Sequence, residues 1–248
     1  MTPERKRLFF TLLTVIIVAV LLVKRFSPSG ENTAFEVTVR KTGSSVSVSA
    51  GANDVYIKSG EISCPELRSR DETVYLTEDM IYTYGFTVQT PMILTLPETT
   101  EVLEVSGSGD IYLSGVNAGI IDAETKAGML DADLLKSDQA VLRTENGPLS
   151  VSGSEVGTLS AVTTGGNADI TGTHAERLEV KTLSGDILAE ADAHDTVLES
   201  SDGAITVYVK APVMLLLEGE AEADEGIISD SADRTLEVKG SVKIMRGE

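Results

Sequence analysis

Six glycines recur along the chain at an almost constant spacing. They stand 19, 19, 19, 19 and 18 residues apart, at Gly109, Gly128, Gly147, Gly166, Gly185 and Gly203. A fixed period of this length is typical of solenoids, in which each repeat is one coil that buries its apolar face only against its neighbours. The spacing therefore predicts stacked coils of a single chain instead of a globular interior.

Each of these glycines is followed by a short alternating segment. The residues two and four positions after each glycine are all apolar, which places them on one face of a strand because side chains alternate across a strand. Nine of them form the predicted core ladder: Ile111, Leu113, Leu130, Leu149, Val151, Ile170, Ile187, Ile205 and Val207. A second alternating pair precedes each glycine, as in Ile121 and Ala123. Each coil is thus expected to hold two short strands joined by a glycine turn, where a tight reversal, often with φ > 0, favours glycine.

The apolar pattern continues toward the N-terminus with weaker glycine marking. Val37, Val55, Val74 and Leu94 step by 18, 19 and 20 residues toward Leu113. With this spacing, roughly ten coils stacked at ~4.8 Å would form a rod on the order of 50 Å long. The predicted fold is all-β, a single-stranded parallel β-helix (β-solenoid) with about 19 residues per coil.

The expected domain boundaries follow from where this pattern begins and ends. The β-solenoid is assigned to residues 35–210, because Pro212 interrupts the repeat. Residues 211–248 are expected to form irregular C-terminal coils and a cap, with the acidic run from Glu218 to Glu225 as a solvated loop. Charged and proline-bearing ends are expected to block the open ends of the stack.

An uncharged apolar segment lies near the N-terminus. Residues 8–23 carry no charge, and with Lys24 and Arg25 they predict a transmembrane anchor over residues 8–25, which would bind the chain to the membrane. Three basic residues precede the segment and two follow it, which favours a cytoplasmic tail at residues 1–7. A linker at 26–34 would lead to an extracytoplasmic solenoid on a single-pass cell-membrane protein. A cleaved signal peptide is the alternative, although no small-residue cleavage site follows the apolar run.

The chain is strongly acidic, with a formal net charge of −19. Without residues 1–25, which hold five basic residues and one acidic residue, the net charge is about −23. Such a surface repels a phosphate backbone, so no nucleic-acid partner is expected. The charge could simply keep an exposed rod soluble, or it could attract cations or a basic partner.

Candidate chemistry is sparse in this sequence. Carboxylates do not stack on adjacent coils, since the residues after the six glycines are Asp110, Met129, Pro148, Asn167, Asp186 and Ala204. Residues 165–169 (GGNAD) are similar to calcium-binding nonapeptides but lack their third glycine and their tandem repetition. We therefore assign no catalytic, cofactor-binding or metal-binding residue and expect no enzymatic activity.

Two histidines and one cysteine leave alternatives open. His174 and His194 are 20 residues apart, about one coil, so they could be neighbours on one edge and bind a metal, or they could be exposed loop residues. Cys64 is the only cysteine and can form no internal disulfide. It is expected to be a small buried side chain, with a reactive thiol as the alternative.

Three segments resemble the adhesin-like β-strand-repeat domains of uncharacterised bacterial envelope proteins. They are residues 94–97 (LTLP), 103–111 (LEVSGSGDI) and 178–187 (LEVKTLSGDI), and the resemblance covers about residues 35–248. It implies a β-helical domain, often tethered by one N-terminal span and sometimes linked to envelope-stress or regulatory systems. The matching positions are turn and core residues, so the resemblance transfers no catalytic residue.

These observations predict a non-catalytic binding, scaffold or regulatory module of the cell envelope that contacts an unknown envelope protein or a surface polymer. Hydroxyl-bearing rows expected to be exposed for such contacts are Thr163, Thr164, Thr171, Thr173 and Thr182. A self-assembling structural β-helix scaffold at the membrane is the alternative hypothesis. A polysaccharide-active enzyme is the third.

Overall fold

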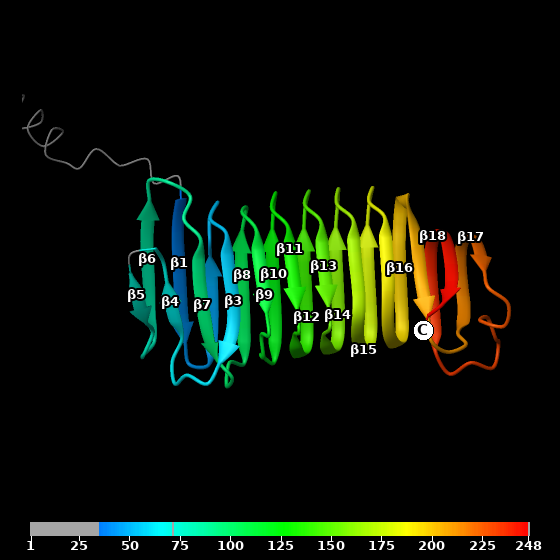
Figure 1. Ribbon diagram of the computed structural model, residues 1–248, viewed down its shortest axis with the longest axis horizontal. Coiled ribbons are helices and arrows are strands. Elements are labelled where there is room, and N and C mark those ends of the chain that lie inside the picture. Colours follow the sequence, from blue (N-terminus) through cyan, green and yellow to red (C-terminus); the bar gives the residue numbers. More distant parts are fainter. Residues whose placement is uncertain (1–34, 71, 248) are drawn as a thin grey trace, which may run out of the picture.

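The computed structural model describes residues 35–70 and 72–247, and this part of the chain is a rod of stacked β-strands (Figure 1). Most neighbouring strands run parallel, and partners lie about 19 residues apart in the sequence. The all-β solenoid predicted from the glycine spacing is confirmed. It has about eight turns, fewer than the ten expected.

Two columns of parallel strands form the long faces of the rod. The first column contains β2 (Ser45–Ser49), β8 (Val102–Gly107), β10 (Ile120–Thr125), β12 (Lys136–Thr144) and β14 (Glu155–Thr163). The second contains β3 (Val55–Gly60), β9 (Ile111–Ser114), β11 (Leu130–Asp133) and β13 (Leu149–Ser152). Two long strands, β15 (Ala168–Thr182) and β16 (Ile187–Val209), bend from one column into the other and contribute residues to both.

The core lies between the two columns and consists of apolar stacks along the rod axis. The nine residues of the predicted core ladder are each at most 3% exposed. Ile121 and Ala123, which precede a glycine turn, are also buried and face Leu103 and Val105 on one side and Ala140 and Leu142 on the other. Because every coil supplies the same two faces, burial depends on the neighbouring coils and not on any one coil alone.

The N-terminal part does not follow the predicted spacing. Ile57, not Leu94, is the direct neighbour of Leu113, and Val55 pairs with Ile111 and Met92. An excursion between β3 and β9 explains the difference. It consists of β4 (Glu66–Arg68), β5 (Thr73–Tyr75), β6 (Met80–Phe86) and β7 (Met92–Pro97), and it leaves and rejoins the stack. Alternating apolar residues occur in any half-buried strand, so their spacing alone could not distinguish this excursion from two regular coils.

Antiparallel strands close the N-terminal end of the rod. β1 (Phe35–Thr42) pairs antiparallel with β2 and β6, and β4 pairs antiparallel with β5 and β7. Between these layers the Tyr84 ring lies edge-on to Phe86, with centroids 4.7 Å apart, and the Tyr82 hydroxyl donates a hydrogen bond to Glu72 at 2.9 Å. Burial, and next this hydrogen bond, raise the pKa of Tyr82 to about 12. Aromatic side chains therefore cover the end of the core.

Regular strands form the C-terminal end, where irregular coils and a cap were expected. β18 (Thr235–Arg246) pairs with β16 on one side and with β17 (Met214–Ala223) on the other, so β17 is the outermost layer (Figure 1). The expectation of a solvated loop from Glu218 to Glu225 is wrong for most of that run, because residues 218–223 belong to β17. In residues 217–223, Leu, Gly or Ala alternates with Glu, which is a strand pattern. The many charges in this segment made it look like a loop.

The proposed tail, anchor and linker at residues 1–7, 8–25 and 26–34 lie outside the described residues. Within residues 35–70 and 72–247, no helix is long and apolar enough to span a membrane.

Candidate functional site

The six repeat glycines lie where neighbouring coils come closest together. A Cβ atom on Gly147 would lie 1.8 Å from the carbonyl oxygen of Gly128, and one on Gly166 would lie 2.0 Å from that of Gly147. Gly128, Gly185 and Gly203 show the same contact with the glycine of the preceding coil, and Gly109 meets the backbone of Asn53. None of the six has a left-handed φ, so the expectation of φ > 0 at these turns is wrong. Close backbone approach is what requires glycine here.

A column of buried hydroxyl groups forms hydrogen bonds with the backbone of these glycine turns. Thr163 Oγ1 donates to the carbonyl of Gly147 at 3.2 Å and accepts from the amide of Gly166 at 3.0 Å. The same two bonds to glycine are made by the hydroxyl groups of Thr125, Thr182 and Ser200 in other coils. Thr144 instead donates to the carbonyl of Gly147 in its own turn. The prediction that Thr163, Thr173 and Thr182 are exposed is therefore wrong, while Thr164 is exposed and Thr171 is half-buried. The buried hydroxyl groups of Thr163 and Thr182 hold neighbouring coils together and are not available for outside contacts.

The acidic residues at the turns also have structural roles. Asp110 Oδ1 accepts from the amide of Met129 at 2.8 Å, and Asp186 Oδ1 accepts from the amide of Ala204 at 2.8 Å. Met129 offers no such acceptor, and the next coil carries Pro148 there, which has no amide hydrogen to satisfy. The interruption of the carboxylate column therefore follows hydrogen-bonding need.

The two histidines are not neighbours of each other. His174 is level with Asp192, and their nearest side-chain atoms are 3.4 Å apart. His194 contacts Asp195 at 3.3 Å. After the register shift between Thr171 and Thr173, paired residues of β15 and β16 are 18 apart in the sequence, so His194, 20 residues after His174, lies two positions beyond its pairing partner.

Hydrogen bonds lower the pKa values of the two carboxyl groups beside these histidines, Asp192 and Asp195. Arg234 hydrogen-bonds to Asp192 and lowers the pKa of that carboxyl group, with a smaller contribution from His174. Thr235 donates to Asp195 at 2.6 Å and is the main cause of its lowered pKa. Together with the His174–Asp192 contact, these hydrogen bonds connect β15 and β16 to the start of β18.

The described residues contain no cluster of three or more His, Cys, Asp or Glu side chains that could hold a metal ion. In the calcium-like segment, Asn167 Oδ1 accepts from the amide of Asp186 at 3.0 Å, which gives this turn the same structural role as its neighbours. Cys64 is free and half-buried, so the buried position expected for it is reached only in part.

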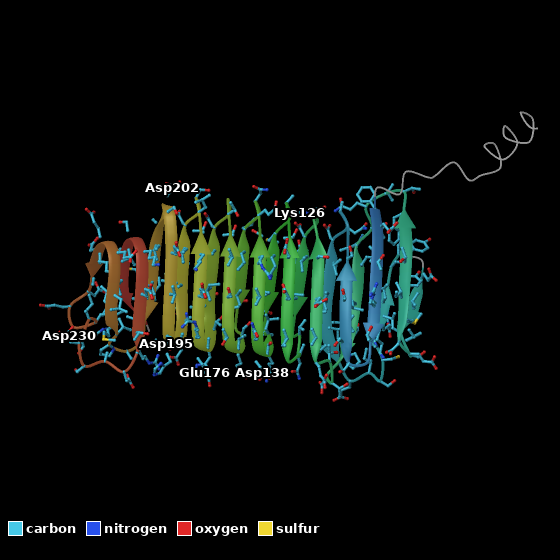
Figure 2. The ribbon with its side chains drawn as sticks, turned by 180° about the vertical axis from the view of Figure 1, so that it is seen from behind. Lys126, Asp138, Glu176, Asp195, Asp202 and Asp230 are labelled. Atoms are coloured by element: carbon cyan, nitrogen blue, oxygen red, sulfur yellow. The ribbon has the colours of Figure 1, made fainter. Side chains whose placement is uncertain are left out.

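The lateral surfaces carry many acidic side chains along both edges of the rod. Figure 2 shows Asp138, Glu176 and Asp195 along one long edge and Asp202 on the other, with Asp230 on the loop at the C-terminal end. Several charges on the faces are paired between coils, as in the two-bond contact of Arg143 with Asp122, at 2.6 and 3.2 Å. These ion pairs lie on the surface and contribute little to the stability of the fold.

The structure singles out β17 as the candidate binding site. Among the described residues, β17 pairs with β18 alone, and the loop at 224–234 touches its outer edge only at Val213, just before the strand begins. Every residue from Leu216 to Ala223 is exposed. An unpaired strand edge offers backbone donors and acceptors to another extended segment. The sequence interpretation missed this strand, although the alternation in residues 215–223 carries its signal.

Comparison with known proteins identifies the family. The comparisons with curated proteins and with solved structures gave no match. The family model described as Toastrack DUF4097 matches residues 33–241, which includes nearly all of the rod. The chain therefore belongs to the Toastrack DUF4097 family.

Proposed function

We propose that this chain is a single-pass, membrane-anchored module of the cell envelope that binds a partner with the far end of an extracytoplasmic rod. The observation that supports this function is the position of β1 and β17 at opposite ends of the stack (Figure 1). An anchor at residues 8–25 would hold the β1 end near the bilayer. About eight coils at ~4.8 Å would then place β17 about 40 Å farther out.

The proposed role is non-catalytic: by binding an envelope protein, the rod would act as a scaffold for that protein or regulate it. The buried hydroxyl column and the turn carboxylates of Asp110 and Asp186 hold coils together, as the bonds of Thr163 and Asp110 illustrate. An open strand edge, in contrast, has backbone groups available for a partner. The acidic surface argues against nucleic acid and anionic lipid as partners, because both are themselves negatively charged.

Self-assembly into a structural filament is the second candidate. In the described part of the chain, strand edges are unpaired at both ends, at β5 and β6 as well as at β17. Stacking of one rod on the next would join these edges. The net charge of −19 opposes that association, because every copy repels every other. We therefore rank it below partner binding.

Cysteine accessibility in intact cells tests the location of the rod. In a Cys64→Ser background, Asp202→Cys would place one thiol on an exposed turn, and Thr2→Cys would place one in the expected cytoplasmic tail. A membrane-impermeant maleimide should label the first variant in intact cells and the second only after lysis. Labelling of Asp202→Cys only after lysis would contradict the extracytoplasmic location. Sedimentation of the detergent-solubilised full chain at high salt tests self-assembly, and growing polymers would favour the filament.

A further inference from the structure

We propose that the open edge of β17 binds an extended, basic segment of a partner protein, which adds to the rod as one further strand. This inference rests on the proposed function, because that function presents the C-terminal end of the rod to partners. It adds to that function the exact surface and the chemistry of the partner.

The backbone of β17 has one satisfied side and one open side. Met214 donates its amide to the carbonyl of Arg234 at 2.8 Å, and Asp224 donates to that of Ile244 at 3.1 Å, so the even-numbered amides face β18. Because amides alternate along a strand, those of Leu217, Ala221 and Ala223 face the open edge. An incoming strand would find a row of donors and acceptors at the usual spacing of ~4.8 Å.

The apolar columns of the core end without a cover along β17 from Leu217 to Ala223, whereas the loop residue Ile227 is buried beside Val213, just before the strand. Leu217 lies over Val238, and Ala223 lies over Ile244. The inner members of these pairs are fully buried, whereas Leu217 is 37% exposed and Ala223 is exposed as well. The N-terminal end has aromatic rings in this position, and β17 has none. A partner strand with apolar residues at alternate positions would complete the columns.

The other face of β17 specifies the charge of the partner. Glu218, Glu220 and Glu222 alternate with the core-side residues, so their side chains are about 6.7 Å apart along one face. Lys239 and Lys243 lie beside Glu218 and Glu222 on the β18 side only. On the open side, Lys or Arg at every second position of an incoming strand would stand opposite the three carboxylates.

The same charges disfavour a second copy of this chain as the occupant. Pairing of two β17 edges would bring glutamates against glutamates, which is destabilising for directly opposed like charges. Among the described residues, β5 and β6, whose edges are unpaired at the other end of the rod, carry no charged side chain to complement them. A basic segment from another protein is the occupant that matches both faces of the strand.

Binding of a synthetic peptide to the full chain in detergent tests the proposal. The probe is a labelled peptide of about ten residues that alternates valine and lysine, and its controls are a peptide alternating valine and glutamate and one with the same valines and lysines in two blocks. Ala221→Pro removes an amide that faces the open edge and leaves the bonds to β18 in place. Ala221→Thr, which keeps that amide, is its matched control. The triple variant E218Q/E220Q/E222Q removes the charges of β17, and D138N/E176Q/D202N removes three exposed charges elsewhere (Figure 2).

The expected result is binding of the alternating basic peptide alone. Ala221→Pro and the β17 triple variant should each weaken it by about tenfold or more, while both controls stay within about twofold, and added salt should weaken binding to the wild type. Equal loss in the two triple variants would overturn the proposal, because it would show general attraction to an acidic surface. Failure of the peptide to bind, or self-association abolished by Ala221→Pro, would also overturn it. All of these outcomes are independent of the cysteine labelling that tests the proposed location.

Discussion

The close stacking of the repeat glycines makes Gly166→Ala the sharpest test of how the coils pack. The new Cβ atom would lie 2.0 Å from the oxygen and 2.5 Å from the carbon of the Gly147 carbonyl, and 2.9 Å from the nitrogen of Pro148. All three are backbone atoms, so relief requires the two coils to separate by about 1 Å or more. Separation would break the hydrogen bond from Thr163 to the Gly147 carbonyl, which joins the two coils, at about 1 kcal/mol, and overpacking adds about 1–3 kcal/mol. The free energy of unfolding should therefore fall by about 2–4 kcal/mol.

Urea unfolding of the full chain in detergent, followed by far-ultraviolet circular dichroism, measures this loss. Gly165→Ala is the matched control, because its Cβ would meet only ordinary contacts, the nearest at 3.6 Å from Asn146 Oδ1. Removing a glycine from an unstrained position restricts the unfolded chain, so this variant should be neutral or more stable by about 0.5 kcal/mol. A loss below about 1 kcal/mol for Gly166→Ala, or equal losses for the two variants, would refute the stacking argument.

Three further predictions concern the hydroxyl column, the core and the contact of Asp192 with Arg234. Thr163→Val should lower the free energy of unfolding by about 1–3 kcal/mol, because it leaves the Gly166 amide without its acceptor and removes one of the two hydroxyl donors to the Gly147 carbonyl. Thr164→Val, at an exposed residue, should change it by less than about 0.5 kcal/mol in the same urea experiment. Leu142→Ala should cost about 2–5 kcal/mol by thermal or urea unfolding, since Leu142 is fully buried, and Leu183→Ala, at an exposed residue, is its control. The lowered pKa of Asp192 means that its carboxylate stabilises the fold above the unfolded pKa of about 4, and that this stability is lost as pH falls through the lower folded pKa. Asp192→Asn should therefore lack part of the acid-side fall in melting temperature that the wild type shows, and a fall of equal size would contradict the Arg234 contact.

The sequence predicted the regular coils because their constraints repeat. Gly147 and Leu149 mark a turn and a core position that recur one coil later at Gly166 and, as a smaller residue, at Ala168. A repeated physical requirement leaves a repeated residue type, so the spacing alone identified the solenoid and the ladder positions that the structure buries. The physical reason for glycine was not visible, because the distance between two coils depends on the stacked structure.

Both ends of the rod were harder to predict because their constraints occur only once. The excursion that contains β4 to β6 has alternating apolar residues like any coil, and only its antiparallel pairing reveals that Val74 lies outside the regular stack. At the other end, Glu218, Glu220 and Glu222 suggested a solvated loop. Their alternation with Gly219 and Ala221 was the informative signal, but an edge strand can be exposed on both faces, which removes the contrast that usually marks a strand.

Residue-specific hydrogen exchange of the full chain in detergent, by nuclear magnetic resonance, tests the open edge of β17 most directly. Exchange of an amide is slow where its hydrogen is bonded in a stable strand pair and fast where it is free. The structure predicts fast exchange at Leu217, Ala221 and Ala223, and slower exchange at the alternating amides of Glu218 and Glu222, which face β18. Slow exchange at all five would contradict the account, because it would mean that another strand already covers the edge proposed to bind a partner.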